Sequence, residues 1–316
     1  SKSFLEDFLT YSQCVVAAVV NFGGIVGNVI NLVVFAKMGF HETINISLFS
    51  LAASDLGCLV TLQWTYLCYN PLFRAADLPF NAVVVEYITG GWPHVGFSRV
   101  AGMLTAYATF ERCLCVTLPM DVKRLLTPKK TVCVVAAIFV LVFASITPVF
   151  TVNLLLPEFY PPLNKTWVGI VFTGNRAEVE QVLFSMTNIY GYMSFVLVAL
   201  FTVVLINRLI AKTKWRDDVI FSHTRTSTVS MRDKKVARMM ATVSCLFITL
   251  TFPLTAVYLT SAVMPDFGRG GILESVFQVS VASAISFEMI NSSVNVLVYL
   301  KMSSRYKEVV VKLFLR

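Results

Sequence analysis

Seven long segments that are almost free of charge dominate this chain. A transmembrane helix needs roughly 17 to 25 mostly apolar residues to cross about 30 Å of hydrocarbon, and each segment is long enough. The short alternating stretches typical of a membrane β-barrel are absent from the sequence. The sequence therefore predicts an all-α, single-domain bundle of seven transmembrane helices, with approximate spans at residues 12–37, 44–70, 94–118, 130–151, 180–211, 235–264 and 273–301.

The composition argues against a water-soluble globule. Hydrophobic residues make up 56% of the chain and charged residues only 14%, whereas soluble domains carry about 25% charged residues. In water, the excess apolar surface would form exposed patches that favour aggregation. The net charge of +8 does not indicate nucleic-acid binding, because basic residues clustered beside uncharged segments are typical of the cytoplasmic edge of a membrane protein.

The distribution of Lys and Arg sets the orientation. With the amino terminus outside the cell, 19 basic residues fall in the inner connections and inner tail, and the outer side holds only Lys2, Arg74, Lys165, Arg176 and Arg269. The positive-inside rule thus predicts a multi-pass plasma-membrane protein with an extracellular amino terminus and a cytoplasmic carboxyl terminus. Residues 303–315 are predicted to form an amphipathic helix at the inner surface. The sequon at Asn164 falls in an outer loop and is a candidate glycosylation site.

The cysteines argue against a disulfide in the outer loops. All seven lie within or beside the hydrophobic segments, and the long outer loop over 152–180 contains none. We expect them to be buried free thiols that pack as small apolar side chains.

The few polar residues inside the spans form a pattern. Each costs roughly 3 kcal/mol in lipid unless it faces the bundle interior. Their local sequences are Gly-Asn-Val-Ile-Asn at Asn28, Leu-Ala-Ala-Ser-Asp at Asp55, Glu-Arg-Cys at Arg112, Phe252-Pro253, and the segment from Asn295 to Tyr299, with Pro119 and Tyr306 each seven residues after a motif. With these motifs the chain resembles the rhodopsin-like, class A family of G-protein-coupled receptors over nearly its whole length. The resemblance implies a receptor, not an enzyme, that binds an extracellular ligand and activates a heterotrimeric G protein.

The resemblance assigns a central polar site. Asn28, Asp55 and Asn295 are expected to meet in the middle of the bundle, where the Asp55 carboxylate could hold water or a sodium ion. Asn291 and Ser292 of the seventh span are expected to complete the shell around the ion. The alternative is an interhelical hydrogen-bond cluster that only stabilises the fold. The family usually has a hydroxyl where this chain has Ala101, which weakens the case for the ion.

A coupling site is implied at the inner end. There Arg112 is expected to be held by acids, namely Glu111 and Asp233, and released toward a G protein. Asp233 is placed at the inner mouth because it lies 20 residues before Pro253, about 30 Å along a helix. The alternative is that Asp233 is an ordinary surface charge. The second inner loop, with Pro119 and Met120, is expected to contact the G protein, and Tyr299 is expected to act as a conformational switch.

Several family features are missing. The sixth span has Thr251 in place of the usual Trp, Val296 replaces the usual Pro of the seventh span, and the outer-loop disulfide is absent. Without that proline the seventh helix loses an expected kink, so the swing of Tyr299 should be weaker. These losses indicate a divergent branch. The phrases Gly-Trp-Pro-His and Phe-Glu-Arg-Cys-Leu-Cys-Val resemble invertebrate, especially molluscan, chemosensory or neuropeptide receptors.

The ligand pocket is predicted from unusual intramembrane charges. Arg99 and Glu288 lie in the outer half of their spans, and with His94, Ser98 and Tyr258 they form the candidate pocket. Two interpretations stay open. Arg99 and Glu288 either pair with each other as internal structure or contact a charged ligand, such as a small chemosensory acid, an amino acid or a peptide terminus.

Two other classes of membrane protein were considered. A small transporter or channel-like protein is the alternative, but no duplicated segment is apparent. A membrane enzyme is disfavoured because the sequence has neither a metalloprotease His-Glu-x-x-His nor a Gly-x-Ser-x-Gly motif. Apart from the sodium ion, no cofactor is expected.

Overall fold

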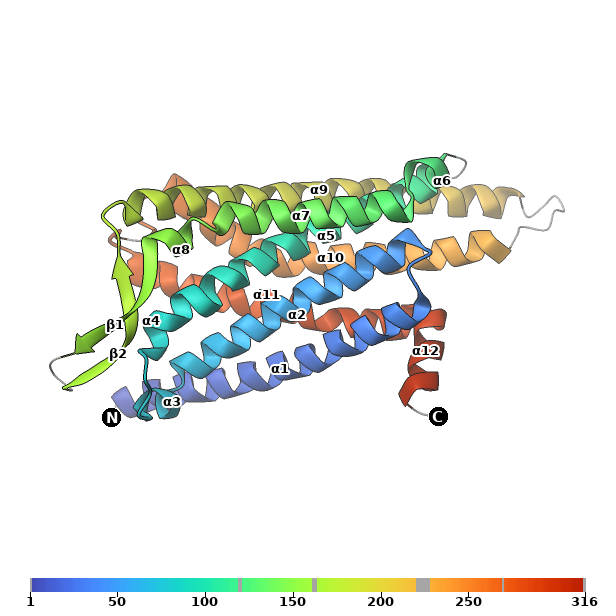
Figure 1. Cartoon of the computed structure of the whole chain (residues 1–316). Helices are drawn as coiled ribbons and strands as arrows, with labels where there is room; N and C mark the ends of the chain where they lie inside the picture. Colours follow the sequence, from blue (N-terminus) through green and yellow to red (C-terminus); the bar gives the residue numbers. More distant parts are fainter. Residues whose placement is uncertain (1, 119–120, 161–163, 220–227, 269, 315–316) are drawn as a thin grey trace.

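The long helices run side by side along one axis (Figure 1). The computed structural model describes residues 2–118, 121–160, 164–219, 228–268 and 270–314, with side chains from residue 17 onward except at 123, 160, 165 and 212–233. Within these ranges the long helices are α1 (Lys2–Met38), α2 (Thr43–Tyr69), α5 (Trp92–Thr117), α7 (Pro128–Ile146), α9 (Arg176–Val219), α10 (Thr228–Val263) and α11 (Glu274–Met302).

Short elements connect the long helices or follow them. They are α3 (Pro71–Ala75), α4 (Ala82–Glu86), the π-helix η1 (Tyr87–Gly91), α6 (Val122–Leu125), α8 (Val149–Val152), strands β1 (Asn153–Tyr160) and β2 (Lys165–Phe172), and α12 (Ser304–Phe314). The strands and α12 lie at opposite ends of the bundle (Figure 1).

Helix α5 occupies the centre of the bundle. In the described chain, six helices are long and apolar enough to cross a membrane. The remaining long helix, α5, has 26 residues and carries Arg99, Glu111 and Arg112. It packs against α2, α7, α9 and α10, so its charged residues lie among other helices rather than against lipid. The prediction of an all-α bundle of seven transmembrane helices is confirmed.

The outer surface of the bundle is apolar. Val140 on α7, Val196 on α9 and Val263 on α10 are 68%, 60% and 74% exposed. Buried polar residues such as Asn28 and Asp55 face the interior instead. This arrangement matches a protein solvated by hydrocarbon, where polar groups must be satisfied inside the bundle.

Prolines set two helix boundaries. Pro128 occupies the first turn of α7, where its missing N–H is not needed, and the Thr127 side chain accepts a hydrogen bond from the Lys130 amide. The predicted fourth span, 130–151, is not continuous, because the helix is interrupted at Thr147–Pro148 before the short α8. Helices α9 and α10 extend past their predicted spans, which ended at residue 211 and began at 235.

A β-hairpin, absent from the predicted all-α fold, covers the end of the bundle that the sequence predicts to be outer. The names outer end and inner end are kept below for the hairpin end and the α12 end. Strands β1 and β2 pair antiparallel from Asn153 opposite Phe172 to Tyr160 opposite Lys165. Val168 on β2 also exchanges main-chain hydrogen bonds with the outer loop after α2: its N–H donates to the Pro79 carbonyl at 2.9 Å, and its carbonyl accepts from the Asn81 N–H at 3.1 Å. These backbone bonds attach the hairpin to the segment that leads into α5.

Side chains fasten the same hairpin to the bundle. Trp92, at the start of α5, is 2% exposed, and its cluster includes Ile170 of β2. The Arg176 guanidinium lies 3.9 Å from the centre of the Phe172 ring and pairs with Glu180 at 2.9 Å. The six cysteines with described side chains are free, and the expectation that they are buried is wrong for Cys133 and Cys245, which are exposed on the apolar helices α7 and α10. Packing and backbone pairing therefore hold this cover in place.

Helix α12 has the predicted amphipathic character. Tyr306 is fully buried, and Val309 and Val310 pack on the main core cluster. Its polar residues face outward, and Arg305 pairs with Glu42 at 2.8 Å. The helix is thereby fixed against the inner end of α1 and α2.

Candidate functional site

A small cavity lies between α5, α9, α10 and α11 in the half of the bundle nearest the hairpin. Its volume is about 30 Å³, enough for one or two water molecules. Four predicted ligand residues line it: Ser98, Arg99, Tyr258 and Glu288. The fifth, His94, lies directly behind Glu288. The lining residues that the sequence prediction missed include Asn188, Tyr192, Ser194, Phe247 and Thr255.

Glu288 is held by two side chains of α5. The Ser98 hydroxyl donates to its Oε1, and the His94 Nε2 lies 3.7 Å from its Oε2. The other ring nitrogen of His94, Nδ1, lies 3.1 Å from the Cys58 carbonyl oxygen. A carbonyl can only accept, so Nδ1 carries a hydrogen. Without a further proton, the facing Nε2 and Oε2 atoms are both acceptors and repel each other. The contact becomes favourable when His94 or Glu288 carries that proton.

Arg99 lies on the other side of the cavity. Its guanidinium rests against α9, where a Cβ added to Gly191 would lie 3.3 Å from the Arg99 Cζ. Among the described residues, Arg99 and Glu288 form no ion pair, and the buried Nε of Arg99 has no hydrogen-bond partner. The two charges therefore share one cavity and interact through space, but no direct ion pair joins them.

The central polar site is partly assembled as expected. The Asn295 amide donates to the Asp55 Oδ2 at 2.9 Å, and the Ser292 hydroxyl lies beside the same carboxylate. Asn28 does not join this carboxylate; its amide donates to the Ser292 carbonyl oxygen at 2.8 Å. Asn291 is buried on the same helix.

The Asp55 carboxylate has one oxygen available to bind a small cation. Its Oδ1 is buried and has no hydrogen-bond partner within the described part of the chain. A carboxylate oxygen beside a hydroxyl suits a hard cation such as sodium, which prefers oxygen ligands. Ala101 on α5 is buried but offers no oxygen, so α5 provides no side-chain ligand at that position.

At the inner end, Glu111 is fully buried and held by hydroxyls. Ser47 of α2 donates to its Oε2 at 2.6 Å, and Thr131 of α7 donates to its Oε1 at 3.3 Å. In the described chain, Glu111 makes no ion pair with the adjacent Arg112, whose Nε is buried without a partner. The residues Pro119 and Met120 and the side chain of Asp233 lie outside the described residues.

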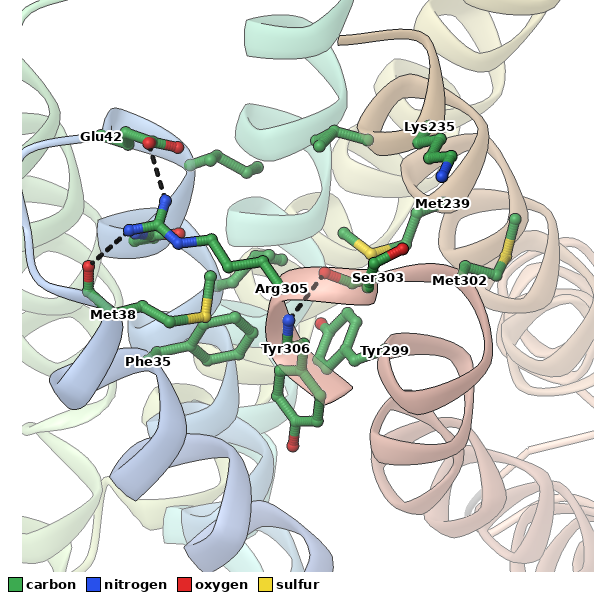
Figure 2. A pocket seen from close by; sticks show the side chains of 15 residues that line it. Phe35, Met38, Glu42, Lys235, Met239, Tyr299, Met302, Ser303, Arg305 and Tyr306 are labelled. Carbon is green, nitrogen blue, oxygen red and sulfur yellow. Dashed lines mark hydrogen bonds and ion pairs between the residues drawn. The ribbon is translucent and has the colours of Figure 1, made fainter. Parts of the chain in front are cut away.

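A larger crevice opens at the inner end beside α12 (Figure 2). Its volume is about 350 Å³, and α1, α2, α10, α11 and α12 contribute to it. Figure 2 shows the rings of Phe35, Tyr299 and Tyr306 together at its base and Lys235 and Arg305 near its edges. Tyr299 packs edge-on against Phe35 with 5.3 Å between ring centres. The residue predicted to switch is therefore a wall of this crevice.

One hydrogen-bond chain at this end was not predicted. The buried Tyr306 hydroxyl donates to the Asn31 Oδ1 at 2.6 Å, and the Asn31 amide donates to the Asn28 Oδ1 at 3.2 Å. It connects α12 to the central polar region through α1. Val296, where the family usually has Pro, packs closely against α1, because a Cβ on Gly27 would lie 2.9 Å from its Cγ1.

Comparison with known proteins places the chain in a family. A family model described as 7 transmembrane receptor (rhodopsin family) matches residues 27–299. No curated protein matches the chain in a sequence search. The matched range runs from just before Asn28 to Tyr299 and includes the whole outer cavity and the central polar residues. The inner crevice is lined partly by residues 302–306, which follow the matched range. Since this range is most of the sequence, the chain belongs to the rhodopsin family of seven-transmembrane receptors.

Proposed function

We propose that this protein is a plasma-membrane receptor that binds an extracellular ligand, either a peptide or a small chemosensory molecule, and activates a heterotrimeric G protein. The ligand binds in the cavity between α5, α9, α10 and α11, and the G protein binds at the inner crevice. The amino terminus is extracellular, and Asn164, an exposed residue in the turn of the hairpin, carries a glycan. The protein performs no covalent chemistry.

One observation carries the proposal: a single face of α11 connects the two cavities. Glu288, Ser292, Asn295 and Tyr299 follow one another at helical spacing and are all buried. Glu288 lines the outer cavity, Asn295 bonds to Asp55 in the middle, and Tyr299 lines the inner crevice. A rotation or shift of α11 at its outer end would therefore reach the crevice directly, as a population shift between two packings requires.

Asp55 is proposed to hold a sodium ion in the packing without ligand. The free Oδ1 and the neighbouring Ser292 hydroxyl support this assignment. The ion would supply a positive charge that keeps the Asp55 carboxylate ionised in the bundle interior. Asn295 would orient that carboxylate through its hydrogen bond.

Nucleotide exchange on purified G proteins tests the function. The full chain, reconstituted in lipid nanodiscs, should accelerate exchange on at least one heterotrimer. Arg112→Ala should abolish this acceleration, because Arg112 is the buried cation at the inner end of α5. Lys312→Ala, which removes an exposed basic residue of α12 that does not line the crevice, is the control and should retain it. Unchanged exchange with Arg112→Ala, or solute flux into vesicles without exchange, would contradict the receptor mechanism.

A further inference from the structure

The outer cavity contains a positive charge that the protein itself does not balance. The His94 Nε2 lies 3.7 Å from the Glu288 Oε2, and this contact is favourable only when one of the two groups carries a further proton, because two acceptors would otherwise face each other. If the proton is on His94, the pair is an imidazolium and a carboxylate. If it is on Glu288, both groups are neutral. In either case the charges of the pair sum to zero. Glu288 interacts with Arg99 through space, but His94, Glu288 and Arg99 together keep one net positive charge.

The other ionisable groups nearby do not take its place. The spans facing Arg99 from α9 and α10 carry no acid between Gln181 and Asn207 or between Met239 and Pro265. Asp55 bonds to Asn295 and does not line the cavity. Glu86 lies at the outer end, where its Oε1 accepts from the Thr65 hydroxyl, and it does not line the cavity either.

We propose that the ligand of this receptor carries an acidic group, a carboxylate, that binds the Arg99 guanidinium. This inference rests on the proposed function, because it names the ligand class of the same cavity. An arginine fork matches the two oxygens of a carboxylate, and a charge in a poorly hydrated site favours a partner of opposite sign.

The rest of the cavity fits a small apolar body attached to that acid. Phe247, Leu254 and Tyr258 provide apolar surface from α10, and Asn188 and Ser194 on α9 offer hydrogen bonds beside the guanidinium. The free volume of about 30 Å³ means that the cavity must widen on binding, and a short acid requires the least widening. A small monocarboxylic acid therefore suits the site better than a peptide.

Thermal unfolding of the purified full chain in detergent tests this assignment. The probes are straight-chain and aromatic monocarboxylic acids, each measured beside its own primary amide. At least one acid should raise the unfolding temperature and its amide should not. Arg99→Gln should weaken the response about tenfold to a hundredfold, as loss of a charge-assisted hydrogen bond predicts. Arg176→Gln, which removes a basic residue already paired with Glu180, is the matched control and should respond like the wild type.

Unliganded stability separates a ligand site from an internal pair. Since Arg99 is an unbalanced charge, Arg99→Gln should unfold at the same temperature as the wild type or higher. A lower temperature, restored by adding Glu288→Gln, would show that the two residues stabilise each other and would overturn the proposal. So would a panel in which no acid acts, or in which acid and amide act equally.

Nucleotide exchange keeps the two proposals distinguishable. An acid that binds through Arg99 but leaves exchange unchanged on every heterotrimer would refute G-protein coupling and leave the anion site standing. Basal exchange that depends on Arg112, with no acid bound, would support coupling and refute the anion site.

Discussion

The Tyr306–Asn31 hydrogen bond should contribute measurably to the attachment of α12. Tyr306→Phe removes only the hydroxyl and keeps the ring contacts with Phe35 and Tyr299. The bond is 2.6 Å long and both residues are buried, so we expect its loss to cost about 1 to 2 kcal/mol of unfolding free energy. Interhelical bonds within bilayers average about 0.6 kcal/mol, which sets the lower bound.

A double-mutant cycle measures this contribution. Unfolding in a graded denaturing detergent would be followed for Tyr306→Phe, Asn31→Ala and the double variant, and their coupling energy should exceed about 0.6 kcal/mol. Tyr299→Phe is the matched control, because its hydroxyl makes no hydrogen bond to the described residues. Equal losses for the two Tyr→Phe variants, or a coupling energy of zero, would refute the reasoning.

Three further predictions concern the two ends of the bundle. Ser47→Ala removes the hydroxyl that donates to the buried Glu111 at 2.6 Å. It should destabilise the observed packing of α2 against α5 by about 1.5 to 3 kcal/mol and raise basal nucleotide exchange. Ser50→Ala is the control, and unchanged exchange in Ser47→Ala would contradict the role of the bond. Trp92→Ala empties the cluster beneath the hairpin and should cost about 3 to 5 kcal/mol of unfolding free energy, whereas Trp64→Ala, at a half-buried position, should cost less. Burial raises the pKa of Glu86, so ionisation of its carboxyl group opposes folding. The unfolding temperature of the wild type should therefore fall as the pH rises from about 4 to 7. The Glu86→Gln variant should not show this fall.

The seven helices were predictable because hydrocarbon imposes length and apolar character on every span. The same constraint placed Arg99, Glu288 and Asp55 in the interior, since a charge facing lipid would be too costly. The amphipathic α12 followed from the alternation of Val309, Val310 and basic residues along the last segment.

The hairpin and the hydrogen-bond partners could not be predicted in the same way. The stretch at the start of β1, Leu154 to Leu156, is a continuous apolar run without the alternation that identifies a strand. Its partner strand is fixed by distant contacts, such as Val168 with Pro79. Likewise, the attachment of Glu111 to Ser47 and Thr131 joins three helices, and nothing in the local sequence around any of them indicates it.

The way the hairpin is held has a consequence for handling this receptor. Its outer cover depends on main-chain bonds at Val168 and on the packing of Trp92, while the six described cysteines are thiols already. The hairpin therefore offers dithiothreitol no disulfide to reduce. Ligand-binding measurements should give the same result in reducing and oxidising buffers.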